Sequence, residues 1–328
     1  IEGDMPVVPT GLVDALLQRG GLLLDALGPS MAMRLRCERV PLAPPEDGIA
    51  GVAANVPEGE LPIVDFQFNS QRANVTMRGN IRDGKYIGTT PLVLKVSEVT
   101  KQLSERFIKG LPLVGSLEKK PEDMPATLRA EGMIVPLGNT MDGLNMRVSL
   151  DPGEARFETS GLFNQLLKAV STRTEGQVGK RLDPLEVIVK DGIASYTTWK
   201  VPVGEFMVET EGFVNLSTRS VTQATPYGDI RLEPQHIDVI TWVPFGALSD
   251  RALGQLNLGI GGALNKITPG AVDALTKIPF RTRGPSNNPT TNVDAELVAK
   301  NLVNQIKPEK VIDSILGNIL KPKPAPPK

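Results

Sequence analysis

The side chains that most often carry out catalysis are scarce in this chain. Its 328 residues include one histidine, His236, and one cysteine, Cys37. A nucleophilic triad would need His236 beside a serine or cysteine, with a carboxylate behind the imidazole. Asp238 lies two residues from His236, but the sequence contains no Gly-x-Ser-x-Gly nucleophile elbow. We therefore predict that the protein is not an enzyme, that it has no catalytic residues, and that His236 and Cys37 are dispensable.

Metal and cofactor sites are also not expected. One imidazole and one thiol cannot supply the usual ligands of zinc, and no Asp-x-Asp-x-Asp-Gly calcium loop occurs. The glycine run Gly259-Ile-Gly-Gly262 lacks the spacing of a dinucleotide-binding turn and the lysine of a P-loop. The sequence therefore predicts no metal and no cofactor.

The charge balance argues against nucleic acid as a partner. Lys and Arg total 36, Asp and Glu total 37, and the formal net charge is -1. Binding to phosphates needs clustered positive charge, which is absent from the sequence. The informative residues are instead the ones that form surfaces.

Several segments alternate apolar and polar residues, a pattern that places one set of side chains on each face of a β-sheet. Such a sheet either packs its apolar face on its own helices or curls and leaves part of that face as a groove for lipid tails. The second alternative makes seven residues candidates for lipid contact on a concave face. They are Leu144, Met146, Val148, Val187, Val189, Phe206 and Val208.

The order of the segments favours a β-rich α+β fold. We expect a twisted antiparallel sheet, taco-like or groove-like, with amphipathic helices against one face and a helical C-terminal end. Helices are expected to begin at Ser97 and near Ser160. Strands are predicted at Met31–Val40, Pro62–Ser70, Asn74–Asn80, Lys85–Val96, Leu185–Lys190, Ile193–Val201, Glu205–Glu211, Phe213–Arg219 and Ile237–Val243, with a meander over Thr127–Phe157.

The chain is expected to divide into four parts. These are an N-terminal helical segment (1–30), a β-rich domain with inserted helices (31–292), C-terminal helices (293–320) and a tail rich in Pro and Lys (321–328). Two similar Asp-Gly phrases, Ile81-Arg-Asp-Gly84 and Val189-Lys-Asp-Gly192, are typical of hairpin turns. Their similarity leaves open whether the domain contains a structural repeat.

The last expected helix, Pro308–Leu320, has an apolar stripe at helical spacing. At 1.5 Å per residue it is too short to span a bilayer, yet it is too apolar to be left in water. Its polar face has a single basic residue, which favours docking onto this chain's own sheet or another subunit over an anionic lipid surface. The stripe consists of Val311, Ile312, Ile315, Leu316, Ile319 and Leu320.

No run of 18 apolar residues is present, and the sequence does not begin with Met. We therefore expect Ile1 to be an internal residue of a longer precursor, whose upstream part would hold any signal peptide or membrane anchor.

Several short phrases resemble the C-terminal region of AsmA-like proteins, and two of them look most like the large AsmA-like envelope proteins of planctomycete-type bacteria. The first group is Asp191-Gly-Ile193, Val208-Glu-Thr-Glu-Gly-Phe-Val-Asn-Leu216, Ile278-Pro-Phe-Arg-Thr-Arg-Gly284 and Asn288-Pro289. The second is Gly110-Leu-Pro-Leu-Val-Gly115 and Asp151-Pro-Gly-Glu-Ala-Arg-Phe157.

The resemblance implies a groove-shaped, β-rich sheet in the cell envelope, with a role in phospholipid transport or outer-membrane homeostasis. It offers no catalytic residues. We therefore expect a non-enzymatic lipid-binding or lipid-transfer protein of the periplasm, with phospholipid acyl chains as partners and the inner membrane as the anchor of the precursor. One alternative is a structural or assembly subunit, in a homo- or hetero-oligomer, that uses its apolar faces for protein–protein contacts. A third alternative is an unrecognised hydrolase.

Overall fold

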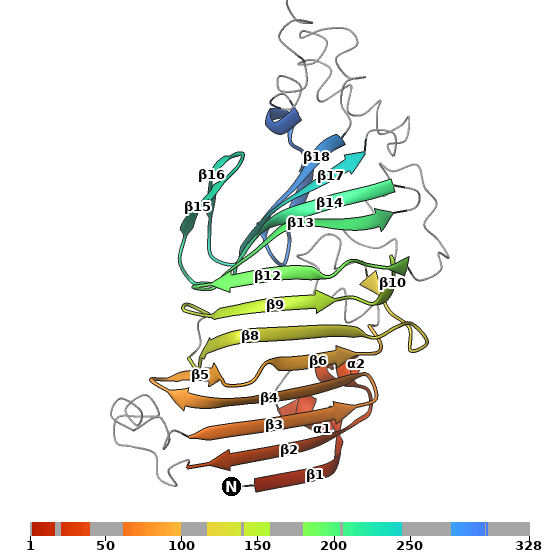
Figure 1. Ribbon diagram of the computed structural model, residues 1–328, viewed down its shortest axis with the longest axis vertical. Helices are drawn as coiled ribbons and strands as arrows, with labels where there is room; N and C mark the ends of the chain where they lie inside the picture. Colours follow the sequence, from red (N-terminus) through yellow and green to blue (C-terminus); the bar gives the residue numbers. More distant parts are fainter. Residues whose placement is uncertain are drawn as a thin grey trace, which may run out of the picture.

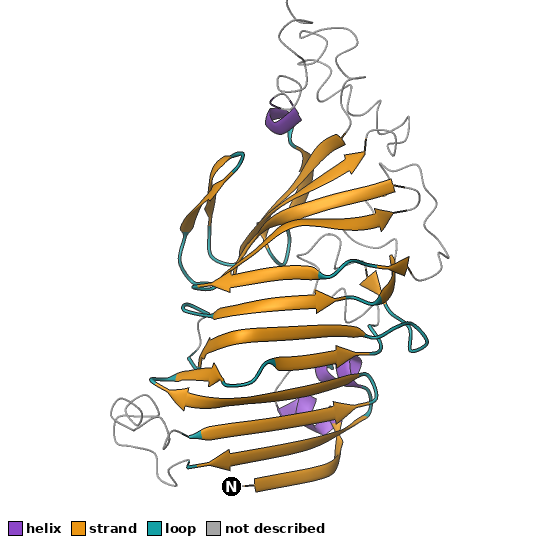
Figure 2. Cartoon of the chain, in the orientation of Figure 1, coloured by secondary structure: helices purple, strands orange, loops and turns teal. Residues whose placement is uncertain are grey.

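One large antiparallel sheet forms the body of the protein and runs along its longest axis (Figure 1). The computed structural model describes residues 2–16, 21–39, 62–99, 117–138, 141–157, 180–203, 206–244, 277–298 and 300. In this part of the chain the sheet has 14 strands. It twists along its length, and its last strands fan away from the first ones (Figure 2). The prediction of a β-rich fold with a twisted antiparallel sheet is confirmed.

The strands follow one another in the sheet almost in the order of the chain. Thirteen of them form one continuous series: β1 (Glu2–Pro9), β2 (Ser30–Glu38), β3 (Ile63–Ser70), β4 (Ala73–Arg82), β5 (Lys85–Gly88), β8 (Ala126–Pro136), β9 (Asn145–Asp151), β12 (Leu185–Lys190), β13 (Ile193–Val203), β14 (Phe206–Asn215), β17 (His236–Pro244), β18 (Lys277–Pro285) and β19 (Thr290–Val293). The remaining strand, β6 (Leu92–Val96), pairs like β5 with β4 and β8.

Smaller elements accompany this sheet. Two helices, α1 (Thr10–Leu16) and α2 (Leu22–Leu27), lie between β1 and β2 in the chain. A small sheet contains β7 (Leu117–Glu118), β10 (Glu154–Phe157) and β11 (Lys180–Arg181), and a separate hairpin is formed by β15 (Val221–Thr225) and β16 (Gly228–Leu232).

The two Asp-Gly phrases form the tight turns expected of them. Asp83 and Gly84 connect β4 to β5, and Asp191 and Gly192 connect β12 to β13. All four residues have positive φ, at 49°, 65°, 51° and 80° in the same order. Positive φ at both central positions is the type I′ geometry, whose twist matches that of the flanking strands.

The register of the strands separates apolar from polar residues over most of the sheet. One row of directly opposed residues crosses seven strands on what we call the apolar face: Met33, Phe68, Val75, Leu94, Leu128, Leu150 and Leu185. The neighbouring row, on the charged face, is Arg34, Gln67, Thr76, Val93, Arg129, Ser149 and Glu186. Period-2 alternation in the sequence thus becomes a continuous apolar surface in three dimensions.

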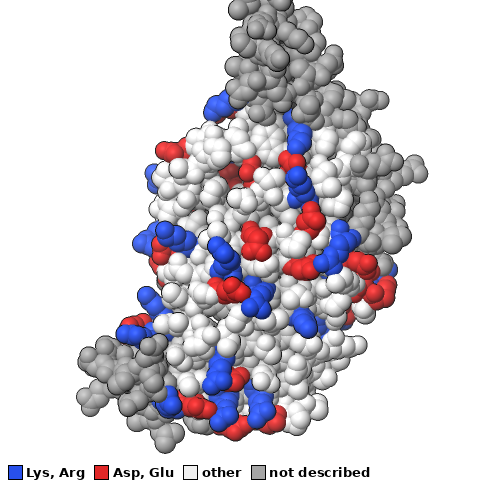
Figure 3. Space-filling view, viewed as in Figure 1, with Lys and Arg blue, Asp and Glu red and all other residues white. Residues whose placement is uncertain are grey.

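The helix α2 packs on the apolar face. Its Leu27 contacts a buried cluster of Met31, Phe68 and Ala73, which belong to β2, β3 and β4. Both helices lie behind these strands in Figure 2. The view in Figure 3 is therefore of the charged face, where acidic and basic side chains of both signs are interspersed.

Several details of the prediction were wrong. The segment Lys85–Val96, expected as one strand, forms the two strands β5 and β6, and the strand expected to reach Arg219 ends at Asn215. Residues 1–30 are not wholly helical, because Glu2–Pro9 forms strand β1 against β2. Ser97 does not begin a helix: Val99 forms a β-bridge with Lys119, and the Ser97 hydroxyl donates to the carbonyl of Arg72. The expected break at Gly212 is absent, since β14 continues through it.

Strand β14 continues through Gly212 because this glycine packs directly against β17. A Cβ atom at this position would lie 2.6 Å from the carbonyl oxygen of Asp238 and 2.7 Å from the Cα of Val239. The glycine therefore permits close strand approach and does not mark a turn.

Several expectations concern residues outside the described ranges. These are the helix near Ser160, the helix Pro308–Leu320 with its six-residue stripe, and the tail 321–328. Of the expected C-terminal helices, residues 295–298 form the described beginning, with Leu297 and Val298 buried.

Candidate functional site

The register brings the predicted lipid-contact residues of three strands to the apolar face. Met146 of β9 lies opposite Val189 of β12, and Val148 lies opposite Val187. Through Ala194 of β13 this surface continues to Val214 of β14.

Two more of the predicted residues belong to β14. Val208 and Phe206 are separated from Val214 by even numbers of residues along the same strand, so they lie on the same face as Val214. Leu144, the seventh residue, immediately precedes β9 and is buried.

These residues differ in how much of their surface is accessible. Val189 and Val208 are buried, with 7% and 2% of their surface exposed. Met146, Val148, Val187 and Phe206 are half-buried. The accessible part of this group thus lies chiefly on β9 and the middle of β12.

Next to β9 the apolar face has a buried cluster of Tyr86, Ala130 and Met133, against which Met146 and Val148 pack. The Tyr86 ring occupies the space above Gly79, where a Cβ would lie 2.5 Å from the ring. Burial raises the pKa of the Tyr86 hydroxyl, which has no hydrogen-bond partner among the described residues. This part of the face is therefore almost wholly apolar in character.

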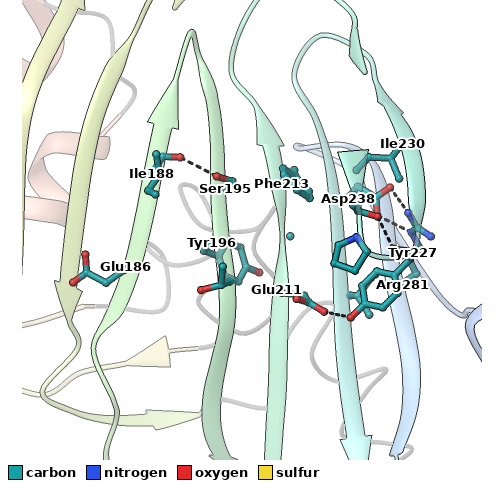
Figure 4. A pocket seen from close by; sticks show the side chains of 15 residues that line it. Glu186, Ile188, Ser195, Tyr196, Glu211, Phe213, Tyr227, Ile230, Asp238 and Arg281 are labelled. Atoms are coloured by element: carbon teal, nitrogen blue, oxygen red, sulfur yellow. Dashed lines mark hydrogen bonds and ion pairs between the residues drawn. The ribbon is translucent and has the colours of Figure 1, made fainter. Parts of the chain in front are cut away.

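A cleft of about 280 Å³ lies on the opposite, charged face (Figure 4). The sheet strands β12, β13, β14, β17 and β18 form one side of it, and the β15–β16 hairpin forms the other. Its apolar lining includes Ile188, Phe213, Ile230 and Ile240. Sequence reasoning missed this feature, although Thr225-Pro-Tyr-Gly228 is a turn sequence between two short alternating segments.

The hairpin is held to the sheet at both of its ends. Near its base, Ile230 and Leu232 pack with Ile193 and Phe213. At its tip, the Tyr227 hydroxyl donates to Glu211 Oε1 at 2.5 Å, and the Tyr227 ring lies 5.8 Å from that of Trp242. The cleft is the space left between these two attachments.

Tyr227 and Glu211 form the polar centre of the tip contact. The Trp242 indole also donates to Glu211 Oε1, at 3.2 Å. Burial, together with the hydrogen bond to the neighbouring Glu211 carboxylate, raises the pKa of Tyr227. The phenol therefore stays protonated and remains the donor in this bond.

A buried ion network borders the cleft. Asp238, whose side chain is 5% exposed, accepts hydrogen bonds from Arg281 Nε at 2.7 Å and Nη2 at 2.9 Å, and from Arg283 Nε at 2.8 Å. Arg281 also donates to Asp294 at 3.0 Å. Burial opposes ionisation of Asp294, but the Leu297 amide and Arg281 outweigh it, so the pKa of Asp294 falls below its usual value.

The residues considered for catalysis do not come together as one site. His236 begins β17, and its Nδ1 lies 2.8 Å from the carbonyl oxygen of Pro234. Cys37 belongs to β2, at the other end of the sheet. Asp238 is occupied by the two arginines. The arrangement joins none of these groups into a nucleophile–base pair.

Within the described residues, no three His, Cys, Asp or Glu side chains are grouped closely enough to hold a metal ion. No helix of that same part of the chain is long and apolar enough to cross a membrane.

Comparisons with protein-family models, with curated proteins and with solved structures found no match for this chain.

Proposed function

We propose that this protein binds the acyl chains of phospholipids on its apolar face and acts, without catalysis, in lipid binding or transfer within the periplasm of a bacterial envelope. The observation that carries the proposal is the continuity of the apolar face. One row of directly opposed apolar residues crosses seven strands, from Met33 to Leu185. A lipid acyl chain is long, flexible and apolar, so it can lie along such a row of apolar side chains.

The energy available from this surface is sufficient for binding. Each methylene removed from water gains about 0.8 kcal/mol, so a dozen would gain roughly 10 kcal/mol before the costs of ordering the chain. No charged anchor is needed for the tail itself. The half-buried members of the predicted set are Met146, Val148, Val187 and Phe206. Three of them lie side by side on β9 and β12, so we expect contact there first.

The test uses two variants of adjacent residues on opposite faces of β9. Val148→Lys places an ammonium on the apolar face, whereas Ser149→Lys adds the same charge to the charged face. Native mass spectrometry of the purified proteins would report co-purifying phospholipid, and displacement of a fluorescent fatty acid would report affinity.

We expect the unchanged protein and Ser149→Lys to bind lipid, and Val148→Lys to lose about tenfold or more in affinity. Equal binding by both variants, or absence of bound lipid in all three proteins, would refute the proposal. Thermal unfolding of each variant separates loss of binding from loss of folding.

A second candidate function, assembly with other protein subunits, is favoured by strand β1. Among the described residues β1 pairs only with β2, and no other described strand lies along its second edge. Met5 and Val7 are 42% and 75% exposed. An open edge with exposed apolar residues favours strand addition by another chain.

The assembly proposal is tested by Val7→Lys in sedimentation velocity. It predicts a self-associating protein whose association this variant weakens. A protein that is monomeric at all accessible concentrations, and that captures no envelope partner, would exclude it.

A further inference from the structure

The cleft on the charged face has a distinct chemistry, unrelated to the lipid surface on the other side of the sheet. The geometry points to a binding site for a small organic cation, an ammonium group carried on a short apolar body. This inference does not depend on the proposed lipid function, because the two surfaces use residues that face in opposite directions.

The charge of the lining favours a cation. Asp238 and Asp294 are matched by Arg281 and Arg283, so the ion network bordering the cleft is neutral as a unit. The lining has two further carboxylates, Glu186 and Glu211, and no further lysine or arginine. The cleft is therefore left with an excess of negative charge.

Both of these carboxylates have free acceptor capacity. Glu186 is exposed and makes no hydrogen bond or ion pair with another described residue. Figure 4 shows it on β12, at the edge of the lining, with no dashed line to the other residues drawn. Glu211 uses Oε1 for Tyr227 and Trp242, and its Oε2 has no hydrogen bond within the described part of the chain. An ammonium group would supply the missing charge at either position.

The guanidinium of Arg281, in contrast, already donates hydrogen bonds to two carboxylates. Its Nε and Nη2 donate to Asp238 and its Nη1 donates to Asp294. An anionic ligand would have to compete with two buried carboxylates for this guanidinium and would meet Glu186 and Glu211 as like charges. The same groups that attract a cation therefore disfavour an anion.

The walls suit the apolar body of such a ligand. Ile188 is 51% exposed, which is unusual for a large apolar side chain in a sheet, and it lines the cleft with Phe213 and Ile230. Phe213 and Tyr227 also line the cleft, and aromatic rings attract cations to their faces. At about 280 Å³ the cleft lies at the small end of the range for ligand pockets, so the ligand should be small.

The experiment compares three probes with the same six-carbon chain: hexyltrimethylammonium, hexanol and hexanoate. Isothermal titration calorimetry on the purified full chain would measure each affinity. We expect hexyltrimethylammonium to bind about fivefold or more tightly than hexanol, because the cation adds cation–π contacts and an exposed ion pair to the same apolar contacts. Hexanoate should bind more weakly than hexanol.

Two matched variants assign the effect to the cleft. Glu186→Gln removes a carboxylate of the lining on β12. Asp229→Asn removes an exposed carboxylate of β16, in the hairpin beside the cleft, that does not line the cleft. We expect Glu186→Gln to weaken binding of the ammonium about threefold and to leave hexanol unchanged, with Asp229→Asn close to the unchanged protein.

Three results would overturn the inference: equal affinity for ammonium and alcohol, equal effects of the two variants, or no binding of the ammonium. Val148→Lys should leave ammonium binding unchanged. If it abolishes that binding while Glu186→Gln has no effect, the probe occupies the apolar face and the cleft is not the site.

Discussion

The buried network of Asp238, Arg281 and Asp294 should be the most sensitive polar element of the C-terminal half of the sheet. The side chains of these residues are 5%, 13% and 11% exposed, so their charges are shielded from water and depend on one another. Removing one partner of a buried ion pair leaves an uncompensated charge and typically costs about 3–5 kcal/mol.

We predict a cost of about 3 kcal/mol for Asp238→Asn. The lower end of the range applies because Arg281 keeps its contact with Asp294 at 3.0 Å. Arg281→Gln should cost a similar amount, since Asp238 keeps Arg283 while Asp294 keeps the amide of Leu297. The costs of the two single variants sum to about 6 kcal/mol. The double variant should cost clearly less than this sum, because each single change leaves an unpaired charge that the other change removes.

Urea unfolding followed by tryptophan fluorescence measures these free energies. The two tryptophans, Trp199 and Trp242, belong to β13 and β17, so the signal reports the half of the sheet that holds the network. Glu296→Gln is the control, because Glu296 lies next to the network. It breaks an exposed pair with Lys300, in which the Glu296 and Lys300 side chains are 77% and 50% exposed, and it should cost less than about 1 kcal/mol.

The reasoning would be refuted if Asp238→Asn and Glu296→Gln had the same effect, or if the costs of the two single variants added in full. Strict additivity would mean that the side chains are not coupled in the folded protein.

Three further predictions follow from features of the sheet and the chain end. Gly212→Ala should lower the free energy of unfolding by about 2 kcal/mol or more, since its Cβ would overlap the backbone of β17, whereas Gly3→Ala, with nothing within 4 Å, should be nearly neutral in the same assay. The lowered pKa of Asp294 adds stability that is present above its ordinary value of 3.8 and is lost as the pH falls through the lower pKa of the folded protein, so the deficit of Asp294→Asn should be constant above about pH 5 and should shrink as the pH is lowered below about 4 in urea titrations. Deleting residues 308–328 should raise hydrophobic dye binding or aggregation, and a truncated protein of unchanged solubility and melting temperature would show that the stripe covers nothing.

The sequence was most informative where the signal is local. Alternation over Leu144–Leu150 predicted a strand with one apolar face, and the Asp-Gly pairs predicted two hairpin turns, because both depend only on neighbouring residues. The apolar face also follows from the sequence once the register is known.

What the sequence did not indicate depends on contacts between distant segments. Strand β1 has mixed composition and two prolines, and it is defined by its pairing with β2. Gly212 resembles a strand end until its approach to Val239 is seen. The cleft requires Tyr227 of the hairpin to reach Glu211 and Trp242, a contact without any sequence periodicity.

The near-sequential order of the strands has a consequence for how this molecule folds and changes. Each strand is bound mainly by the two beside it, so stability is close to a sum of nearest-neighbour terms, as in repeat proteins. Growth of the sheet can proceed strand by strand as the chain leaves the ribosome. Opening at the β1 end need not disturb the β17–β18 end, and hydrogen exchange should therefore show a gradient of protection along the sheet. Because each strand pairs mainly with its neighbours in the chain, insertion or deletion of one hairpin in the series would leave the rest of the apolar face intact.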